Sequence, residues 1–128
     1  MTEKTKTIVV KGGNFPFSKV VKAGGAIYVS GVVGRDDATQ EIPFSAADQA
    51  RIALTKIQNL LSQANADMDD VVKATIFLTD MRYFADVNTV YRSFFSDDQM
   101  PARSCVAVSS LPDPEAKVEI EVIAEASL

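Results

Sequence analysis

The sequence predicts one α+β domain in which two helices pack on the same face of a single mixed sheet. Three observations lead to this prediction. Segments with the alternation or composition of strands occupy both ends of the chain and its middle. Two segments with helical spacing lie between them. The length of 128 residues suits one hydrophobic core, so the single domain is expected over residues 1–128, in the order β-β-β-α-β-α-β-β.

The N-terminal part is expected to form three strands. The first is predicted over residues 5–10, and the next two flank Gly24-Gly25 within residues 20–29. Two glycines between β-rich segments are typical of a tight hairpin, because glycine adopts the positive φ that primed turns need. Directly after the hairpin, Gly31-Val-Val-Gly34 is interpreted as a bulge or turn.

Residues 45–64 are expected to form the first helix, because apolar residues recur there at helical spacing. Ser45 is the expected N-cap, with Asp48 at the capping-box position. Residues 71–78 follow as a mostly apolar strand, which predicts burial on both faces.

The second helix is expected over residues 81–95, with Asp80 as its candidate cap. Its helical spacing predicts an apolar stripe that faces the core. The members of this stripe are Phe84, Val87, Tyr91 and Phe94.

The last two strands, expected over residues 102–109 and 117–124, carry the charged residues that matter most for function. Because side chains alternate along a strand, the apolar residues of the final strand are assigned to the helices and Glu119 to the opposite face. The valines of the preceding strand are likewise assigned to the core, which puts Arg103 on the face away from the helices. Arg103 and Glu119 are therefore predicted to share one face, whether or not the two strands are neighbours. An oligomer is the simplest cover for that face.

The composition excludes several kinds of catalytic site. The chain has no histidine and one cysteine, so it has no Ser-His-Asp triad, Cys-His pair, histidine-based zinc site or internal disulfide. The formal net charge of −4 is unlike the basic footprint of a nucleic-acid-binding protein. No metal site is predicted. Chemistry must come from carboxylates, Arg, Lys, hydroxyls, the thiol, backbone groups and water.

The sequence contains no apolar run of the roughly 20 residues that a membrane-spanning helix needs. Its N-terminal residues also lack the apolar segment of an export signal. A single cysteine agrees with a reducing compartment. We therefore expect a cytoplasmic protein without a membrane partner.

Six segments of the chain carry a resemblance to a known family. The two nearest the C-terminus read PARSCVAVSSLP (101–112) and KVEIEVIA (117–124). The others, in order, are PFS (16–18), IYVSG (27–31), VVKATIFLTDM (71–81) and FADVNTVY (84–91). Together they closely resemble the reactive intermediate deaminase family, also called RidA, YjgF or endoribonuclease L-PSP-like. The likeness covers nearly the whole chain.

The resemblance implies a chorismate-mutase-like fold and a homotrimer with its active sites in the clefts between subunits. It also implies an enzyme that hydrolyses 2-imino or enamine acids, such as 2-iminopropanoate and 2-iminobutanoate, to 2-oxo acids and ammonia. No metal or organic cofactor and no nucleic-acid partner are expected. Such a reaction suits the residues present, because an iminium carbon is already a strong electrophile and hydrolysis needs little more than orientation and a base.

By the same resemblance, Arg103 would clamp the substrate carboxylate and Glu119 would position the attacking water. The other implied site residues hold substrate and water; they are Phe17, Ser30, Gly31, Asn88 and Cys105. The chain departs from the family pattern at two positions. Phe17 stands where the family has tyrosine, which removes a phenolic hydroxyl, and Val32 stands where the family has glutamine.

Two other functions stay open from the sequence. The first is a non-enzymatic trimer that binds small carboxylates or acts like a chaperone, which the missing hydroxyl at Phe17 keeps open. The second, less favoured because of the negative charge, is an endoribonuclease. Cys105 has two interpretations as well: a reactive thiol beside Arg103, or a small half-buried residue that contributes its backbone.

Overall fold

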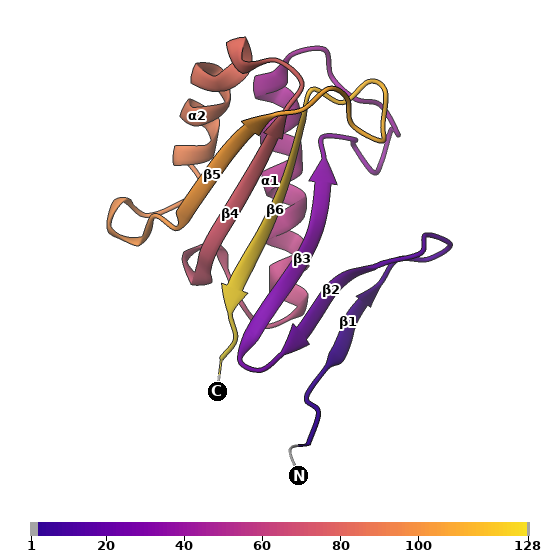
Figure 1. The fold of residues 1–128 in the computed structure, drawn as a ribbon, viewed down its shortest axis with the longest axis vertical. Coiled ribbons are helices and arrows are strands. Elements are labelled where there is room, and N and C mark those ends of the chain that lie inside the picture. The colour runs from indigo at the N-terminus through magenta and orange to yellow at the C-terminus, as the bar shows by residue number, and fades with distance from the viewer. Residues whose placement is uncertain (1–2, 128) are drawn as a thin grey trace.

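A computed structural model describes residues 3–127 of the chain, so residues 1, 2 and 128 of the predicted domain lie outside it. It confirms the predicted α+β architecture: one six-stranded mixed sheet with both helices on one side (Figure 1). The strands are β1 (Thr7–Lys11), β2 (Ser18–Ala23), β3 (Ala26–Val33), β4 (Val71–Leu78), β5 (Ala102–Ala107) and β6 (Val118–Glu125). The helices are α1 (Ala46–Gln63) and α2 (Phe84–Arg92).

The strand order across the sheet is β1-β2-β3-β6-β4-β5. The final strand β6 therefore lies between β3 and β4 and is antiparallel to both. β5 forms the edge and pairs only with β4, in parallel. The two C-terminal strands, whose relation the sequence left open, are thus separated by β4.

The β2–β3 hairpin has the predicted turn, since Gly24 and Gly25 adopt φ values of 56° and 84°. The predicted bulge is also present. Val29 and Val32 are both buried although they are three positions apart, and the pairing of β3 with β6 shifts register between them. The extra residue of the bulge restores the inward direction of the strand. Ser30 and Gly31 lie within this irregular segment.

The first helix matches its prediction closely. The hydroxyl of Ser45 caps α1 by accepting a hydrogen bond from the Asp48 backbone N–H, at 3.1 Å. The predicted second helix is in fact a 3₁₀ turn, Met81–Tyr83, which Asp80 caps, followed by α2. The predicted stripe is wrong at its first member, because Phe84 is 38% exposed. The buried residues of α2 are Val87, Val90 and Tyr91.

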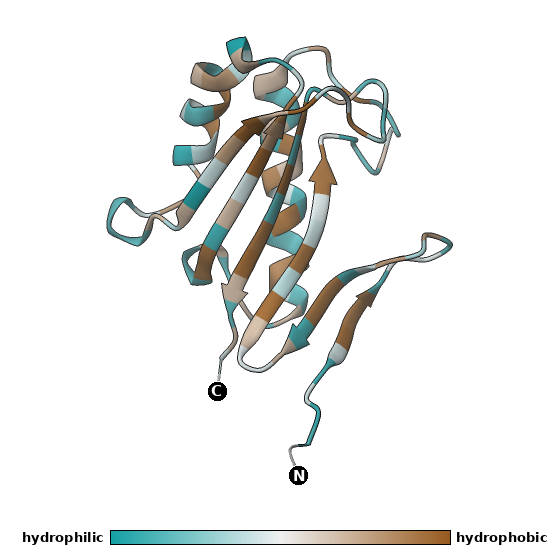
Figure 2. Ribbon diagram, viewed as in Figure 1, coloured by the Kyte–Doolittle hydropathy of each residue, from teal (hydrophilic) through white to brown (hydrophobic). Residues whose placement is uncertain are grey.

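The core lies between the sheet and the two helices. Every second residue of β6 is buried there, and Figure 2 shows the strand as mostly hydrophobic. β4 also alternates, so the prediction that it is buried on both faces is wrong: Val72 is 49% exposed and Lys73 half-buried. No helix within residues 3–127 is both long enough and apolar enough to cross a membrane.

Candidate active site

Arg103 lies on the helix side of the sheet. It pairs with Ala74 of β4, which is fully buried on the core face. Its guanidinium carbon lies over α2, 4.9 Å from the ring centroid of Tyr91 and 5.6 Å from that of Phe84. Glu119 lies on the other side, between the buried Val118 and Ile120. The prediction that Arg103 and Glu119 share a face is therefore wrong.

The error has a physical cause in the composition of β5. An edge strand of small residues offers no strong apolar face, so its alternation does not show which side is inward. The prediction placed Val106 in the core, but it is 43% exposed. The half-buried Cys105 packs against the core instead.

The Arg103 side chain lines a shallow pocket of about 250 Å³ between β5 and α2. Asn88 and Tyr91 from α2 line it, together with Met100 and Pro101 before β5. The Arg103 side chain is half-buried, yet within residues 3–127 it makes no ion pair and no hydrogen bond to another side chain. A half-buried cation without an acidic partner is well suited to receive an anionic ligand.

The Cys105 thiol lies on the same side as Arg103 but is not activated. Burial raises its pKa, and the positive charge of Arg103 only partly opposes that effect. A nucleophilic cysteine needs a lowered pKa, because the thiolate is the reactive form. The structure thus favours the packing interpretation of Cys105.

Glu119 lines a second and larger pocket, of about 680 Å³, on the opposite face. Phe17, Ser30 and Gly31 line the same pocket, so four of the predicted site residues come together here. Burial raises the pKa of the Glu119 carboxyl, and the neighbouring charge of Glu121 adds to this effect. Arg103, on the opposite face, does not offset this effect within one chain.

The Glu119 side chain lies so close to the backbone at position 31 that this position requires glycine. A methyl group at Gly31 would lie 2.7 Å from Oε2 of Glu119, closer than ordinary van der Waals contact allows. The hydroxyl of the adjacent Ser30 donates a hydrogen bond to the carbonyl of Ser18 at 2.6 Å, which fixes β3 against the start of β2. The carboxylate of Glu119 therefore rests directly on the main chain at Gly31.

A tight loop before β2 brings Phe17 to this pocket. Gly12 packs against the Phe17 backbone so closely that a side chain there would clash with the Phe17 carbonyl. The ring of Phe17 stacks on that of Phe15, with centroids 5.5 Å apart and planes inclined by 19°. Both rings stay largely exposed.

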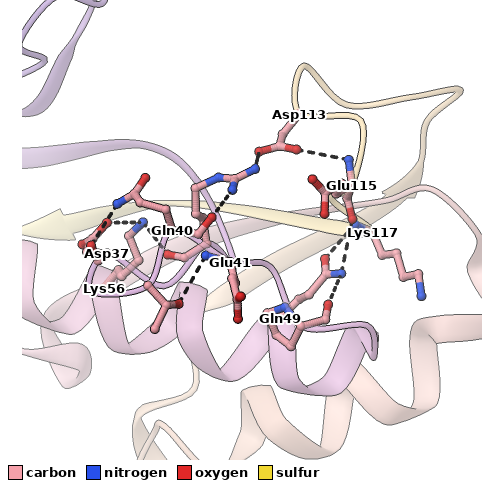
Figure 3. A network of polar contacts seen from close by, with 11 residues as sticks. Asp37, Gln40, Glu41, Gln49, Lys56, Asp113, Glu115 and Lys117 are labelled. Atoms are coloured by element: carbon pink, nitrogen blue, oxygen red, sulfur yellow. Dashed lines mark hydrogen bonds and ion pairs between the residues drawn. The ribbon is translucent and has the colours of Figure 1, made fainter.

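Several site residues were missed by sequence reasoning. Tyr91 and Phe84 were both assigned to the apolar stripe that faces the core. Their seven-residue spacing does place them on one helix face, but both rings of that face lie beside Arg103. Arg35, on the rim of the Glu119 pocket, pairs with Asp113 at 2.6 Å. It also donates to the carbonyl of Gln40 (Figure 3). These residues are up to 78 positions apart, so no local pattern reveals them.

A buried glutamine joins α1 to the strand that carries Glu119. Gln49 is 1% exposed, and its Nε2 donates to the carbonyls of Pro43 and Glu115, at 2.9 and 3.4 Å. Its Oε1 accepts from the backbone N–H of Lys117 at 2.7 Å (Figure 3). This network fixes the start of β6, two residues before Glu119. Among the described residues, no cluster of three His, Cys, Asp or Glu could hold a metal ion.

Comparison with known proteins places the chain in a family. Residues 12–126 match the family model described as Endoribonuclease L-PSP. The chain belongs to the reactive intermediate deaminase (RidA/YjgF) family. It is 42% identical over 110 residues to a Bos taurus protein named 2-iminobutanoate/2-iminopropanoate deaminase, covering 85% of this chain and 79% of that protein. An Escherichia coli protein of the same name is 39% identical over 111 residues, covering 85% and 86%.

Solved structures of family members share the fold. Yeast Mmf1 matches with a TM-score of 0.87 and 33% identity, over 96% of this chain and all of that one. E. coli TdcF with bound serine matches with a TM-score of 0.83 and 36% identity, over 94% and 96%. The similarity extends beyond the sheet to nearly the whole chain, as expected for a chorismate-mutase-like family member.

Proposed function

We propose that this protein hydrolyses reactive 2-imino and enamine acids, with 2-iminopropanoate and 2-iminobutanoate as substrates, to 2-oxo acids and ammonia. The observation that carries the proposal is the presence of two half-sites with complementary chemistry. One presents an unpaired guanidinium, Arg103, which can bind a carboxylate. The other presents a half-buried carboxylate, Glu119, whose raised pKa suits a base. The names of the relatives support the same reaction class.

The two half-sites face opposite sides of the sheet, so one chain cannot bring them to one substrate. We propose that they meet between subunits of a homotrimer. Each active site would then take Arg103, Cys105 and Asn88 from one subunit. Its neighbour would supply Glu119 and the three residues around it, which are Phe17, Ser30 and Gly31. A cyclic arrangement generates three identical sites of this kind.

In the proposed reaction, the planar fork of Arg103 holds the substrate carboxylate with two parallel hydrogen bonds. Glu119 orients a water molecule and accepts its proton as the water oxygen bonds to C2 of the imine. For the protonated imine, Glu119 passes this proton to the nitrogen of the tetrahedral adduct and then accepts the proton of the adduct's new hydroxyl group. The oxygen electron pair forms the carbonyl of the 2-oxo acid as the C–N bond breaks, ammonia leaves, and Glu119 returns its proton to the solvent. The backbone at Gly31 and Cys105 would help to hold the water and the substrate. Neither a metal nor an organic cofactor is needed.

The direct test couples a threonine dehydratase to the purified protein and follows the decay of the imine absorbance. We expect the wild-type protein to accelerate the decay and an Arg103→Ala variant to lose at least about 100-fold in kcat/KM, because both binding and orientation are lost. Arg51→Ala is the matched control, since it removes one exposed cation from α1 without touching either pocket. An Arg103→Ala variant as fast as Arg51→Ala would overturn the proposal.

Subunit mixing tests whether the site is shared. Arg103→Ala and Glu119→Gln are each expected to be inactive alone. In a ring of three, every mixed trimer has one site that combines a wild-type Arg103 with a wild-type Glu119. Random assembly of equal amounts should therefore restore about one quarter of the wild-type activity. Glu119→Gln mixed with the double variant should restore none, and equal recovery in both mixtures would refute a site between subunits.

A second candidate function is binding of small carboxylates without turnover. An Arg103 without an acidic partner supports carboxylate binding alone as well as it supports catalysis. The structure of the relative TdcF has been solved with bound serine. Calorimetric titration with 2-oxobutanoate, beside the imine assay, separates the two functions. Binding that depends on Arg103 without any acceleration of imine decay would select this alternative.

A further inference from the structure

Aromatic rings, not a carboxylate, hold Arg103 in place. Phe84 and Tyr91 lie two helical turns apart on α2, so they project from the same face of the helix. The guanidinium carbon of Arg103 lies within 6 Å of both ring centroids, at 5.6 and 4.9 Å. Distances in this range allow attraction between a cation and the negative face of a ring. Within residues 3–127, Arg103 forms no salt bridge.

We propose that Tyr91, assisted by Phe84, is a positioning residue that aims the Arg103 guanidinium at the substrate carboxylate. The inference rests on the proposed function, in which Arg103 is the clamp. An acidic partner would occupy the N–H donors that the substrate needs. A ring face attracts the cation without accepting those in-plane hydrogen bonds, so the fork stays free for a carboxylate.

Tyr91 is itself firmly held. Its side chain is 5% exposed, and its ring packs against Phe95 with centroids 4.7 Å apart. Phe84 is 38% exposed at the first turn of α2, so it contributes a looser contact. The rigid ring that fixes the guanidinium is therefore that of Tyr91.

The Tyr91 hydroxyl has no part in this contact. It is buried, and within residues 3–127 it has no hydrogen-bond partner. Burial of an unpaired hydroxyl costs stability, so a phenylalanine at this position should keep the platform and stabilise the fold. The ring and the hydroxyl can thus be separated by substitution.

The test compares Tyr91→Leu with Tyr91→Phe. Because the carboxylate is bound alike in the ground and transition states, loss of the platform should act on KM rather than on kcat. We expect Tyr91→Leu to raise KM for 2-iminobutanoate, and the Kd of 2-oxobutanoate measured by calorimetry, by roughly 3- to 30-fold. Tyr91→Phe should keep both constants within about two-fold and raise the melting temperature.

Phe95→Leu is the matched control, because Phe95 packs on Tyr91 and makes no contact of this kind with Arg103. It should lower the melting temperature and leave KM unchanged. If Tyr91→Leu does not fold, Phe84→Leu replaces it, with a smaller rise in KM. The inference fails if the leucine variants keep the wild-type KM, if Tyr91→Phe weakens binding as much as Tyr91→Leu, or if Phe95→Leu does so. A wild-type protein that hydrolyses no imine would instead refute the proposed function, and 2-oxobutanoate binding would still test the platform.

Discussion

The Gly31→Ala substitution should lower the catalytic activity and leave the stability of the fold nearly unchanged. The added methyl group would lie 2.7 Å from Oε2 of Glu119, 2.9 Å from its Cδ and 3.2 Å from its Cγ. Restoring the 3.4 Å of ordinary contact to Oε2 requires a shift of about 0.7 Å. The obstacle is the end of a flexible side chain, so the carboxylate moves and the backbone stays. Its displacement carries the proposed base away from the substrate.

The two magnitudes follow from this geometry. A misplacement of about 1 Å can cost about 100-fold in rate, so we expect kcat/KM for 2-iminobutanoate to fall roughly 10- to 100-fold. Gly31 has no positive φ, and Gly→Ala at such a position gains about 0.4–1 kcal/mol by restricting the unfolded chain. This gain offsets much of the steric cost, so the free energy of unfolding should change by less than about 1 kcal/mol.

Gly34→Ala is the matched control, because its methyl group would clash with two backbone atoms of Gln49, the carbonyl oxygen and Cα. Backbone of a buried helix cannot move aside, so this variant should lose stability rather than a specific catalytic function. Both variants are measured by the dehydratase-coupled assay and by urea denaturation at one protein concentration. Wild-type kcat/KM in Gly31→Ala, or equal destabilisation of both variants, would refute the reasoning.

Three further predictions concern the groups around the two half-sites. Gln49→Ala leaves the Lys117 N–H and the Pro43 carbonyl unpaired and should cost at least about 3 kcal/mol in urea unfolding, against little for the exposed Gln63→Ala on the same helix. Because burial raises the folded-state pKa of Glu119, its ionisation opposes folding above the ordinary carboxyl range. Glu119→Gln should therefore melt higher than wild type at pH 7 and lose this advantage below about pH 4; an advantage that grows on acidification would contradict the sign. Cys105→Ala should keep kcat/KM within about three-fold, since the thiol pKa is raised, and a loss of about 100-fold would point to a reactive thiol.

The sequence predicted those parts of the fold that depend on near neighbours. The Gly24-Gly25 turn, the cap at Ser45 and the bulge at Gly31 each follow from the conformational preferences of a few residues. The order of the strands does not. β6 inserts between β3 and β4 through pairings between residues far apart in the sequence, and no local pattern specifies that choice.

The resemblance supplied the candidate site residues one by one but not their arrangement. Resemblance to the family named Arg103 and Glu119, and the alternation of β6 gave the correct direction for Glu119. Alternation failed for Arg103 because β5 is an edge strand without a clearly apolar face; in the structure the Arg103 side chain lies against Tyr91 of α2. A charged side chain that packs on aromatic rings is buried by partners that hydropathy does not reveal.

The division of the site also bears on how Glu119 would work as a base. In the single chain its carboxyl has no ion-pair partner among the described residues, and burial keeps its pKa raised. In the proposed trimer the Arg103 guanidinium of a neighbouring subunit would approach it and partly oppose this effect of burial, because an opposite charge favours the carboxylate. A bound substrate carboxylate would then offset the charge of the guanidinium and reduce this opposing influence. In the proposed site the carboxylate of Glu119 would thus become a stronger base when the imine binds, and a chain without histidine would have a base where hydrolysis needs one.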